Sequence, residues 1–290
     1  MLVVGPKDGF SEELAENLKC GFIALDKRVF PDNEICPRIM LDNGIKDEHV
    51  VLVNRMQRPT DPNRYLVELL LTIKNLRALG VKKIDTVMPY LVYARQDKIF
   101  RQGEPLSTQY ILQLLKDAGA SRLFSVSVHF QREEGKFPAP LPAFSISGFI
   151  PIANYIKKLN LKKPIIIGPD KKSGQFAKEI AEAMQCESAY LEKKRDLDTG
   201  TIETKTKLDV SGRDVVIVDD IASSGSTLIH AIENLNNPNK VICAVVHPVL
   251  TGDCLEKVSK KAEFISCNTI ASPISKISVA ARIAEFIKAV

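Results

Sequence analysis

No two of the six cysteines are spaced as C-x-x-C, which argues against a zinc ribbon or a thioredoxin-type redox motif. No apolar run approaches the roughly 18 residues that a membrane-spanning helix needs, so we expect no membrane segment. Met1 is followed by neither a basic segment nor a cleavage site, so no signal peptide is expected. Together these absences predict a cytoplasmic protein whose cysteines are reduced and mostly packed.

The chain also has little excess of one charge, because 40 Lys and Arg against 35 Asp and Glu leave a formal net charge of only +5. The sequence contains no basic block with interleaved aromatic residues, so nucleic acid is not an expected partner. The phosphate-binding pattern G-x-x-x-x-G-K is missing as well. A mildly basic balance still suits a small polyanionic substrate.

The length of 290 residues, about twice the ~150 residues of a typical domain, predicts two domains. Short apolar runs alternate with segments of helical period. This order predicts an α/β fold in which mainly parallel sheets are flanked by helices. The expected strands are 50–53, 84–88, 122–128, 165–167, 215–218 and 241–246. The expected helices lie around 62–79, 106–118, 176–184 and 278–290.

A proline-rich stretch from Pro138 to Pro142 is the expected hinge between the two domains. We therefore place an N-terminal domain at 1–145 and a C-terminal domain at 146–277. The last segment, 278–290, carries apolar residues at helical period and is expected to form an amphipathic helix that folds back onto the first domain. Its apolar face consists of Val279, Ile283, Phe286 and Ile287.

Ligands of parallel sheets collect at the carboxyl ends of the strands, so polar residues directly after apolar runs are of interest. Asp219 and Asp220 end the run 215–218, and a loop of small residues then enters a helix. Carboxylates suit sugar hydroxyls, and a helix N-terminus suits a phosphate. An acidic turn with a Ser or Thr helix cap explains the same residues equally well. The loop residues are Ser223, Ser224, Gly225, Ser226 and Thr227.

The run 215–227 resembles the phosphoribosyl pyrophosphate-binding loop of phosphoribosyltransferase-fold proteins. The remaining motifs are spread over nearly all of the sequence, and with them the chain as a whole resembles the ribose-phosphate diphosphokinases in particular. The resemblance implies two tandem phosphoribosyltransferase-like domains. It also implies that Asp219 and Asp220 bind the ribose hydroxyls, and that Ser223 to Thr227 surround the 5-phosphate of ribose 5-phosphate.

A second motif, Ala94-Arg95-Gln96-Asp97-Lys98, follows the expected strand 84–88. In isolation it is typical of a solvated charged loop. It matches the ATP-binding segment of the family, which implies that Arg95, Gln96, Asp97 and Lys98 bind ATP. The turn Phe30-Pro31-Asp32-Asn33-Glu34 resembles the loop with which a neighbouring subunit holds adenine. The resemblance therefore adds Phe30, Asp32, Asn33 and Glu34 to the ATP site and implies a homo-oligomer that is at least a dimer.

Two further motifs concern metal and diphosphate. Each of His129 and Asp170 follows an expected strand, and each alone would be an ordinary structural residue. The family places a His and an Asp at these strand ends, which implies that both belong to a magnesium site, and Mg²⁺ prefers hard oxygen ligands. The stretch after Pro169 is similar to the family's pyrophosphate loop, although Lys172 and Ser173 stand where a Gly-Gly pair is usual. That loop comprises Asp170, Lys171, Lys172, Ser173 and Gly174.

The segment from Leu191 to Lys207 is polar and basic, and alone it is typical of an exposed hairpin. In the family a K-x-R pattern lies on a flap that closes over the reacting phosphates. The resemblance implies catalytic roles for Lys193 and Arg195, and it implies that Arg195 also binds ribose 5-phosphate. The implied reaction transfers the diphosphoryl group of ATP to ribose 5-phosphate for nucleotide biosynthesis. Two alternatives remain: a phosphoribosyltransferase that consumes phosphoribosyl pyrophosphate, and a non-catalytic regulatory homologue.

Overall fold

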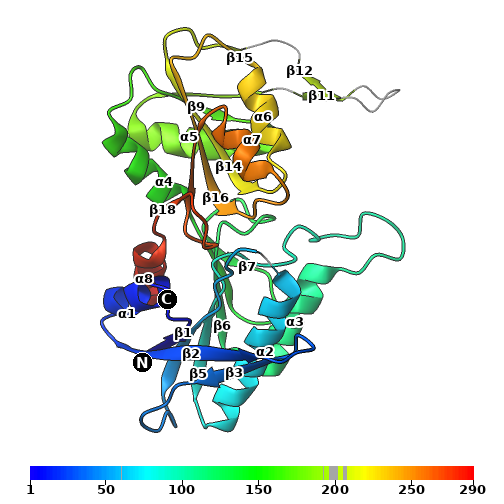
Figure 1. Ribbon diagram of the computed structural model, residues 1–290, viewed down its shortest axis with the longest axis vertical. Helices are drawn as coiled ribbons and strands as arrows, with labels where there is room; N and C mark the ends of the chain where they lie inside the picture. Colours follow the sequence, from blue (N-terminus) through cyan, green and yellow to red (C-terminus); the bar gives the residue numbers. More distant parts are fainter. Residues whose placement is uncertain (60, 192, 196–201, 205–207) are drawn as a thin grey trace. The chain divides into compact units, whose positions relative to one another are not determined.

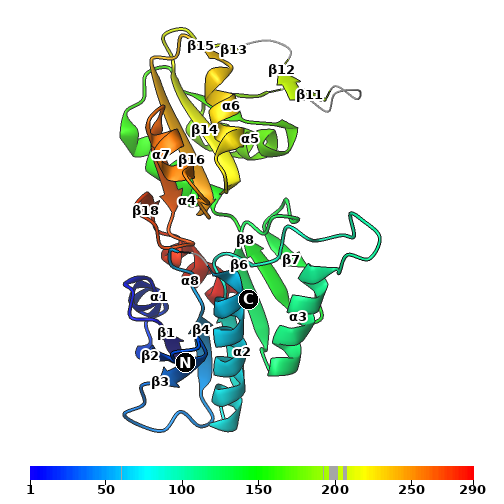
Figure 2. The same cartoon turned by 45° about the vertical axis from the view of Figure 1, so that its right-hand side comes forward.

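The structure is a computed structural model that describes residues 1–59, 61–191, 193–195, 202–204 and 208–290, without the side chains of 192–207. The chain divides into two compact units. Unit 1 comprises 1–147, 269–271 and 278–290, and unit 2 comprises 148–268 and 272–277. Each unit is an α/β domain with a mainly parallel sheet (Figures 1 and 2). None of the helices in the described part of the chain is long and apolar enough to cross a membrane.

This division differs from the expected one in two places. It falls after Ser147, and the proline-rich stretch expected to be a hinge lies inside unit 1, where it joins two antiparallel strands of one sheet. The segment 269–271 belongs to unit 1 because Ala271 N donates to Met56 O at 2.9 Å and Gln57 forms a bridge with Ala271. The chain therefore crosses between the units more than once.

The sheet of unit 1 contains the strands β1 (Leu2–Gly5), β2 (Gly21–Val29), β3 (Ile35–Ile39), β4 (His49–Val53), β5 (Lys83–Val87), β6 (Arg122–Val126), β7 (Gly135–Phe137) and β8 (Ala143–Ile146). Their order is β3-β2-β1-β4-β5-β6-β8-β7. The six inner strands of this order run parallel to one another, and the edge strands β3 and β7 are antiparallel to their neighbours. Apolar residues of the central strands are fully buried, as expected for a parallel sheet covered on both faces.

The helices of unit 1 are α1 (Phe10–Leu18), α2 (Pro62–Ala78), α3 (Ser107–Ala118) and α8 (Ala280–Ala289). Helix α2 begins where the sequence predicts, because the Asp61 side chain accepts a 3.0 Å hydrogen bond from Arg64 N and Pro62 occupies the first position. Parallel crossovers are right-handed. The crossovers through α2 and α3 lead toward one edge of the sheet, and the crossover through α1 leads toward the opposite edge. Helix α1 therefore covers the other face of the sheet from α2 and α3.

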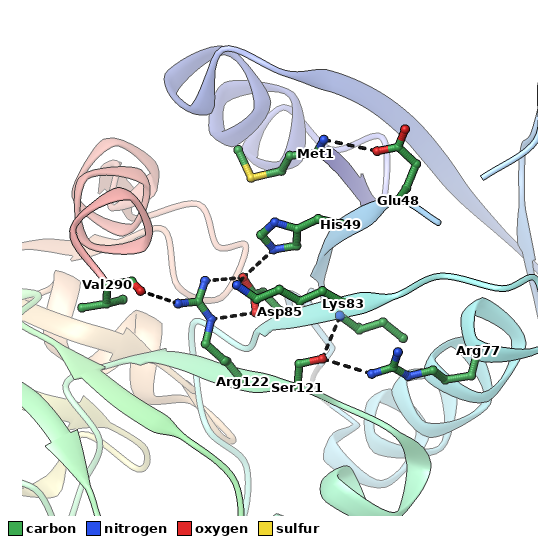
Figure 3. A network of polar contacts seen from close by, with 10 residues as sticks. Met1, Glu48, His49, Arg77, Lys83, Asp85, Ser121, Arg122 and Val290 are labelled. Carbon is green, nitrogen blue, oxygen red and sulfur yellow. Dashed lines mark hydrogen bonds and ion pairs between the residues drawn. The ribbon is translucent and has the colours of Figure 1, made fainter. Parts of the chain in front are cut away.

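Helix α8 packs against α1, so the C-terminal segment is part of unit 1 (Figure 1). The ring of Phe286 lies 5.8 Å from that of Phe144 on β8. The last carbonyl, Val290 O, accepts a 2.8 Å hydrogen bond from Arg122 Nη1. Figure 3 shows that this arginine also contacts the buried carboxylate of Asp85, so α8 is anchored to the start of β5 and β6.

Unit 2 has a sheet made of β9 (Ile165–Gly168), β10 (Glu187–Tyr190), β14 (Asp214–Ala222), β16 (Lys240–Pro248), β17 (Glu263–Cys267) and β18 (Ser275–Ile277). The order is β10-β9-β14-β16-β17-β18, and all of the pairs are parallel. Its helices are α4 (Phe149–Ile156), the 3₁₀ turn η1 (Lys157–Leu159), α5 (Lys171–Met184), α6 (Ser226–Glu233) and α7 (Cys254–Ser259). Two small pairs complete it: antiparallel β11 (Lys193–Arg195) with β12 (Ile202–Thr204), and parallel β13 (Leu208–Asp209) with β15 (Leu235–Asn236).

Candidate active site

The chain leaves the neighbouring strands β9 and β14 in opposite directions. Helix α5 leads from β9 to β10 on one side, and α6 leads from β14 to β16 on the other. The carboxyl ends of such a strand pair form a crevice, which is the usual ligand site of open α/β sheets. Asp170 follows β9 and the pair Asp219–Asp220 lies near the end of β14, so the structure brings the predicted pyrophosphate loop and the predicted ribose acids together at this switch point.

The turn from β9 into α5 is tightly packed against the sheet. A Cβ on Gly168 would lie 2.4 Å from Gly174 N, so only glycine allows the first turn of the helix to approach the strand so closely. The Asp170 side chain caps the helix by accepting a 2.9 Å hydrogen bond from Ser173 N. The backbone of the predicted pyrophosphate loop is therefore held in one place relative to β9.

The two predicted ribose acids are buried, with 8% and 6% of Asp219 and Asp220 exposed. Ser173 Oγ lies 2.8 Å from Asp219 Oδ1, and Asp220 N donates to the same oxygen at 3.0 Å. Burial, and then repulsion from Asp220 and Asp170, raise the pKa of Asp219 to about 7, although the Ser173 hydrogen bond opposes the shift. Lys172 Nζ lies 3.6 Å from Asp220 Oδ2, which places a positive charge beside this acidic pair.

The loop of small residues after β14 leads into α6 with an open helix end. Gly225 is the N-cap residue, with φ of 78°, and makes no side-chain capping bond, so it does not cover the N–H groups of the first turn. The hydroxyls of Ser224 and Ser226 lie 3.0 Å apart on the surface, and Ser223 Oγ lies 3.4 Å from Thr251 Oγ1. Thr227 is half-buried in the first turn. An uncapped helix N-terminus with adjacent hydroxyls suits a phosphate group.

In unit 1, the predicted ATP segment follows β5 as a turn held by the start of α3. Thr108 Oγ1 lies 2.8 Å from Tyr93 O and 2.9 Å from Gln96 O. Gln96 Nε2 donates to Glu104 Oε2 at 3.1 Å, and Lys98 Nζ lies 5.3 Å from the centre of the Phe100 ring. Three of the four predicted residues are exposed and Gln96 is half-buried. The exposed ones are Arg95, Asp97 and Lys98.

The predicted adenine-binding turn joins β2 to β3. Phe30 N donates to Glu34 O at 2.8 Å, and Asn33 N donates to Phe30 O at 2.9 Å. The guanidinium of Arg28 lies 4.2 Å from the centre of the half-buried Phe30 ring. The side chains of Asp32, Asn33 and Glu34 are exposed. The turn is therefore well formed and presents polar groups at the edge of the sheet.

His129 follows β6, so it shares the carboxyl edge of the unit 1 sheet with the Arg95 segment after β5. The other predicted magnesium residue, Asp170, lies in unit 2. Within the described residues, no group of three or more His, Cys, Asp or Glu side chains could hold a metal alone. The carboxylates around Asp219 are hard oxygen donors and fit Mg²⁺, which takes a few protein ligands and completes its shell with water and phosphate oxygens.

The predicted catalytic residues Lys193 and Arg195 have only their backbone described, as strand β11 paired with β12. Their side chains, and the stretch 196–201, lie outside the described residues.

Residues at the carboxyl end of β1 were missing from the sequence-based site. Arg55 Nε, after β4, donates to Asp8 Oδ2, after β1, at 2.8 Å, and both side chains are buried. Strands β1 and β4 are neighbours, and the chain leaves them in opposite directions, so this ion pair occupies the switch point of unit 1. The search for polar residues after apolar runs, applied to 2–4, would have found Asp8.

Comparisons with known proteins agree with this arrangement. Residues 2–119 match the N-terminal domain of ribose phosphate pyrophosphokinase, and residues 151–280 match the phosphoribosyl transferase domain. The chain is 33% identical to the ribose-phosphate pyrophosphokinase of Sulfurisphaera tokodaii, over 96% of both chains, and 35% identical to that of Pyrococcus furiosus, over 96% of this chain and 97% of the other. The chain belongs to the ribose-phosphate pyrophosphokinase family.

The fold agrees with that of a solved relative. The crystal structure of phosphoribosylpyrophosphate synthetase from Mycobacterium smegmatis has a TM-score of 0.81 and 24% identity, and the match covers 99% of this chain and 98% of the other. The prediction of two tandem phosphoribosyltransferase-like domains is therefore confirmed.

Proposed function

We propose that this protein transfers the diphosphoryl group of ATP to the C1 hydroxyl of ribose 5-phosphate, forming 5-phosphoribosyl 1-diphosphate and AMP. The observation that carries the proposal is the match along the whole chain to curated proteins named ribose-phosphate pyrophosphokinase. We place the reaction in the cytoplasm, as a step of nucleotide biosynthesis.

Ribose 5-phosphate is assigned to the switch point of unit 2. The uncapped first turn of α6 and the hydroxyls of Ser223, Ser224, Ser226 and Thr227 would bind its phosphate. Gly225, with φ of 78°, lets the chain turn into the helix close to Cys254 of α7. The carboxylates of Asp219 and Asp220 would accept hydrogen bonds from ribose hydroxyls. Because Asp219 is already fixed by Ser173 and by a backbone N–H, its orientation is set before the sugar arrives.

ATP is assigned to the segment after β5. Arg95 and Lys98 would bind phosphate oxygens, and Gln96 and Asp97 would bind polar groups of the nucleotide. The turn between β2 and β3 would hold the adenine bound to a second copy of the chain. Phe30 would stack on the base, and Asp32 and Glu34 would accept hydrogen bonds from its amino group. Asn33 lies between these two acids and belongs to the same site. This part of the proposal requires at least a dimer.

The bound metal would be Mg²⁺, and His129 in unit 1 and Asp170 in unit 2 would each be a metal-site residue, with substrate phosphates and water as further ligands. When bound, Mg²⁺ would neutralise charge on the phosphate oxygens. The pyrophosphate loop, residues 170–174, would present backbone N–H groups of the α5 first turn to the diphosphate. The tight packing of Gly168 on this turn keeps those groups in position.

The chemical step forms a bond from the C1 oxygen to the β-phosphorus of ATP and breaks the bond from that phosphorus to the oxygen of AMP. The C1 hydroxyl proton passes to solvent, since we assign no general base. Catalysis then rests on positioning and on charge stabilisation. Lys193 and Arg195 would supply positive charge to the phosphoryl oxygens as the transition state forms, with Arg195 also binding ribose 5-phosphate.

The test is to incubate the purified protein with ATP, ribose 5-phosphate and Mg²⁺ and to measure AMP and 5-phosphoribosyl 1-diphosphate. We expect equal amounts of both products, and none without ribose 5-phosphate or Mg²⁺. Formation of a nucleotide from 5-phosphoribosyl 1-diphosphate and a base, without AMP formation from ATP, would instead identify a phosphoribosyltransferase. ATP binding without any turnover would identify a regulatory homologue.

A further inference from the structure

Helices α2 and α3 of unit 1 each expose large apolar side chains. Val67 and Leu71 of α2 are 48% and 45% exposed. Tyr110 and Leu114 of α3 are 59% and 46% exposed. On each helix the two residues are four positions apart, so they lie one above the other on the helix surface. Each helix therefore carries an exposed apolar stripe.

The two stripes lie side by side, because α2 and α3 pack against each other (Figures 1 and 2). Beyond the C-terminal end of the stripes, Lys74 Nζ donates to Asp117 O at 3.0 Å. Beyond the N-terminal end, the Tyr93 hydroxyl contacts Asn63 of α2, and Tyr93 O accepts a 2.8 Å hydrogen bond from Thr108 Oγ1 of α3. The four apolar side chains between these contacts form one surface, which we call the α2–α3 face.

The α2–α3 face has the composition of the central part of a protein–protein interface. Such regions are apolar, contain tyrosine and have a polar rim. The rim here includes Asn63, Gln113 and the opposite charges of Lys74 and Asp117. Val, Leu and Tyr side chains offer no ion pairs to a charged partner such as a nucleic acid, so the face suits another apolar surface. A second copy of the chain supplies one, because in a twofold contact the same face meets itself.

The α2–α3 face is continuous with the predicted ATP segment. Tyr93, which contacts Asn63 at the end of the face, lies two positions before Arg95. A second copy bound to the face therefore lies next to the segment that we assign to ATP. The ATP site of the proposed function needs such a copy, because the β2–β3 turn of one chain completes the site of another.

The hairpin of β2 and β3 also packs on α2, since Lys27 Nζ of β2 lies 3.1 Å from Glu68 Oε2 of α2. Its turn, 30–34, carries two acids and no base, whereas the stretch 95–101 carries three bases and one acid. The turn and the ATP segment are therefore complementary in charge, which favours their contact between two copies. The acids of the turn are Asp32 and Glu34, and the bases of the segment are Arg95, Lys98 and Arg101.

We propose that the α2–α3 face binds the same face of a second copy, and that this twofold contact brings the β2–β3 turn of each copy to the ATP segment of the other. The surface itself follows from the exposed side chains, whereas its link to ATP rests on the proposed function. A twofold axis that crosses the helices sets those of the two copies antiparallel, so helix ends of opposite partial charge meet.

Sedimentation equilibrium of the full chain tests the surface. Leu71→Glu together with Leu114→Glu places like charges on both copies of the face. Both side chains are about half exposed, so unit 1 should keep its fold and its urea midpoint. We expect the wild type to be at least a dimer, and the glutamate variant to bind its second copy at least about a hundredfold more weakly, because facing like charges repel.

Leu71→Lys together with Leu114→Lys separates a lost contact from a damaged fold. Mixed with the glutamate variant, this lysine variant should form dimers through opposite charges, although each variant alone is dissociated. Ile150→Glu is the control, because Ile150 of α4 is 38% exposed and lies in unit 2, and it should keep the wild-type mass. A monomeric wild type, a glutamate variant of wild-type mass or a mixture that stays monomeric would each overturn the inference.

AMP formation separates this inference from the proposed function. The glutamate variant, assayed where it is monomeric, should have a KM for ATP at least about tenfold above that of the wild type, because it lacks the partner's turn. An active wild type with a glutamate variant that stays dimeric contradicts the interface alone. A monomeric glutamate variant with the wild-type KM for ATP contradicts the link to the ATP site. A wild type that forms the dimer through this face but makes no AMP contradicts the proposed function alone.

Discussion

The guanidinium of Arg122 contacts the carboxylate of Asp85 through two hydrogen bonds, 2.8 Å from Nε to Oδ1 and 2.5 Å from Nη2 to Oδ2 (Figure 3). The Asp85 side chain is fully buried, and His49 Nε2 lies 2.7 Å from its Oδ2. Arg122 also donates to Val290 O. One arginine therefore connects β5, β6 and the end of the C-terminal helix.

Arg122→Met should destabilise unit 1 by about 3 kcal/mol, because removing one partner of a buried ion pair leaves the other charge buried without its main partner. Urea unfolding measures the change. The control is Lys82→Met, since Lys82 pairs with Asp47 on the surface at 3.4 Å and such a pair contributes less than about 1 kcal/mol. Equal stability of Arg122→Met and Lys82→Met would show that the Asp85 contact contributes nothing.

The same carboxylate predicts how stability depends on pH. Burial alone would raise the pKa of Asp85, but hydrogen bonds and charge from Arg122 and His49 outweigh burial and lower it. A lowered pKa means that the ionised form stabilises the fold above the unfolded-state pKa of about 3.9, and that this contribution is lost as the pH falls through the folded-state pKa.

The free energies of unfolding of the wild type and of Asp85→Asn, measured at several pH values, test this expectation. Their difference should shrink below about pH 4, as Asp85 becomes protonated first in the unfolded and then in the folded protein. A difference that stays the same at pH 3.5 would contradict a lowered pKa.

Thr108 is expected to affect ATP binding because it holds the backbone of the Arg95 segment. Its hydroxyl contacts two carbonyls of the Arg95 segment, so Thr108→Val would leave both without that donor and loosen the turn. We expect the KM for ATP to rise about three- to tenfold, with kcat and the KM for ribose 5-phosphate within twofold of the wild type. Steady-state kinetics at varied ATP measure this.

Ser107→Ala, at the preceding position of α3, is the control for Thr108→Val and should leave the KM for ATP unchanged. An unchanged KM in Thr108→Val would mean that the turn keeps its shape without this hydroxyl.

Lys193→Ala and Arg195→Ala should each lower kcat by at least about a hundredfold, since each removes a charge that we assign to the transition state. Affinity for ATP, measured by calorimetry, should change less than about twofold. Lys194→Ala lies between them on β11 and has no assigned role, so it should behave like the wild type. Near-normal turnover in both catalytic variants would remove the flap from the mechanism.

Local features of the fold could be predicted from the sequence because their causes lie within a few residues. Asp61 and Pro62 begin α2 through a cap and a fixed φ angle, and the run 215–218 lies in a buried parallel strand because it is continuously apolar. The hinge expected at Pro138–Pro142 was wrong for a related reason. Prolines mark an interruption of regular structure, and here they form the loop that joins the antiparallel strands β7 and β8 inside unit 1.

The sequence by itself determined the elements with a clear apolar run, period or cap, such as the strand at 215–218 and the helix that begins at Pro62, since these signals are local. It did not predict strands such as β1 and β2 or the helix α1. Only the tertiary structure decided which loops share a switch point, because strand order depends on pairing between distant segments. Ser173 and Asp219 are 46 positions apart and lie 2.8 Å from each other through their side-chain oxygens. Lys172 likewise reaches Asp220 because β9 and β14 are neighbours. No periodicity encodes such contacts, since they follow from the packing of whole strands.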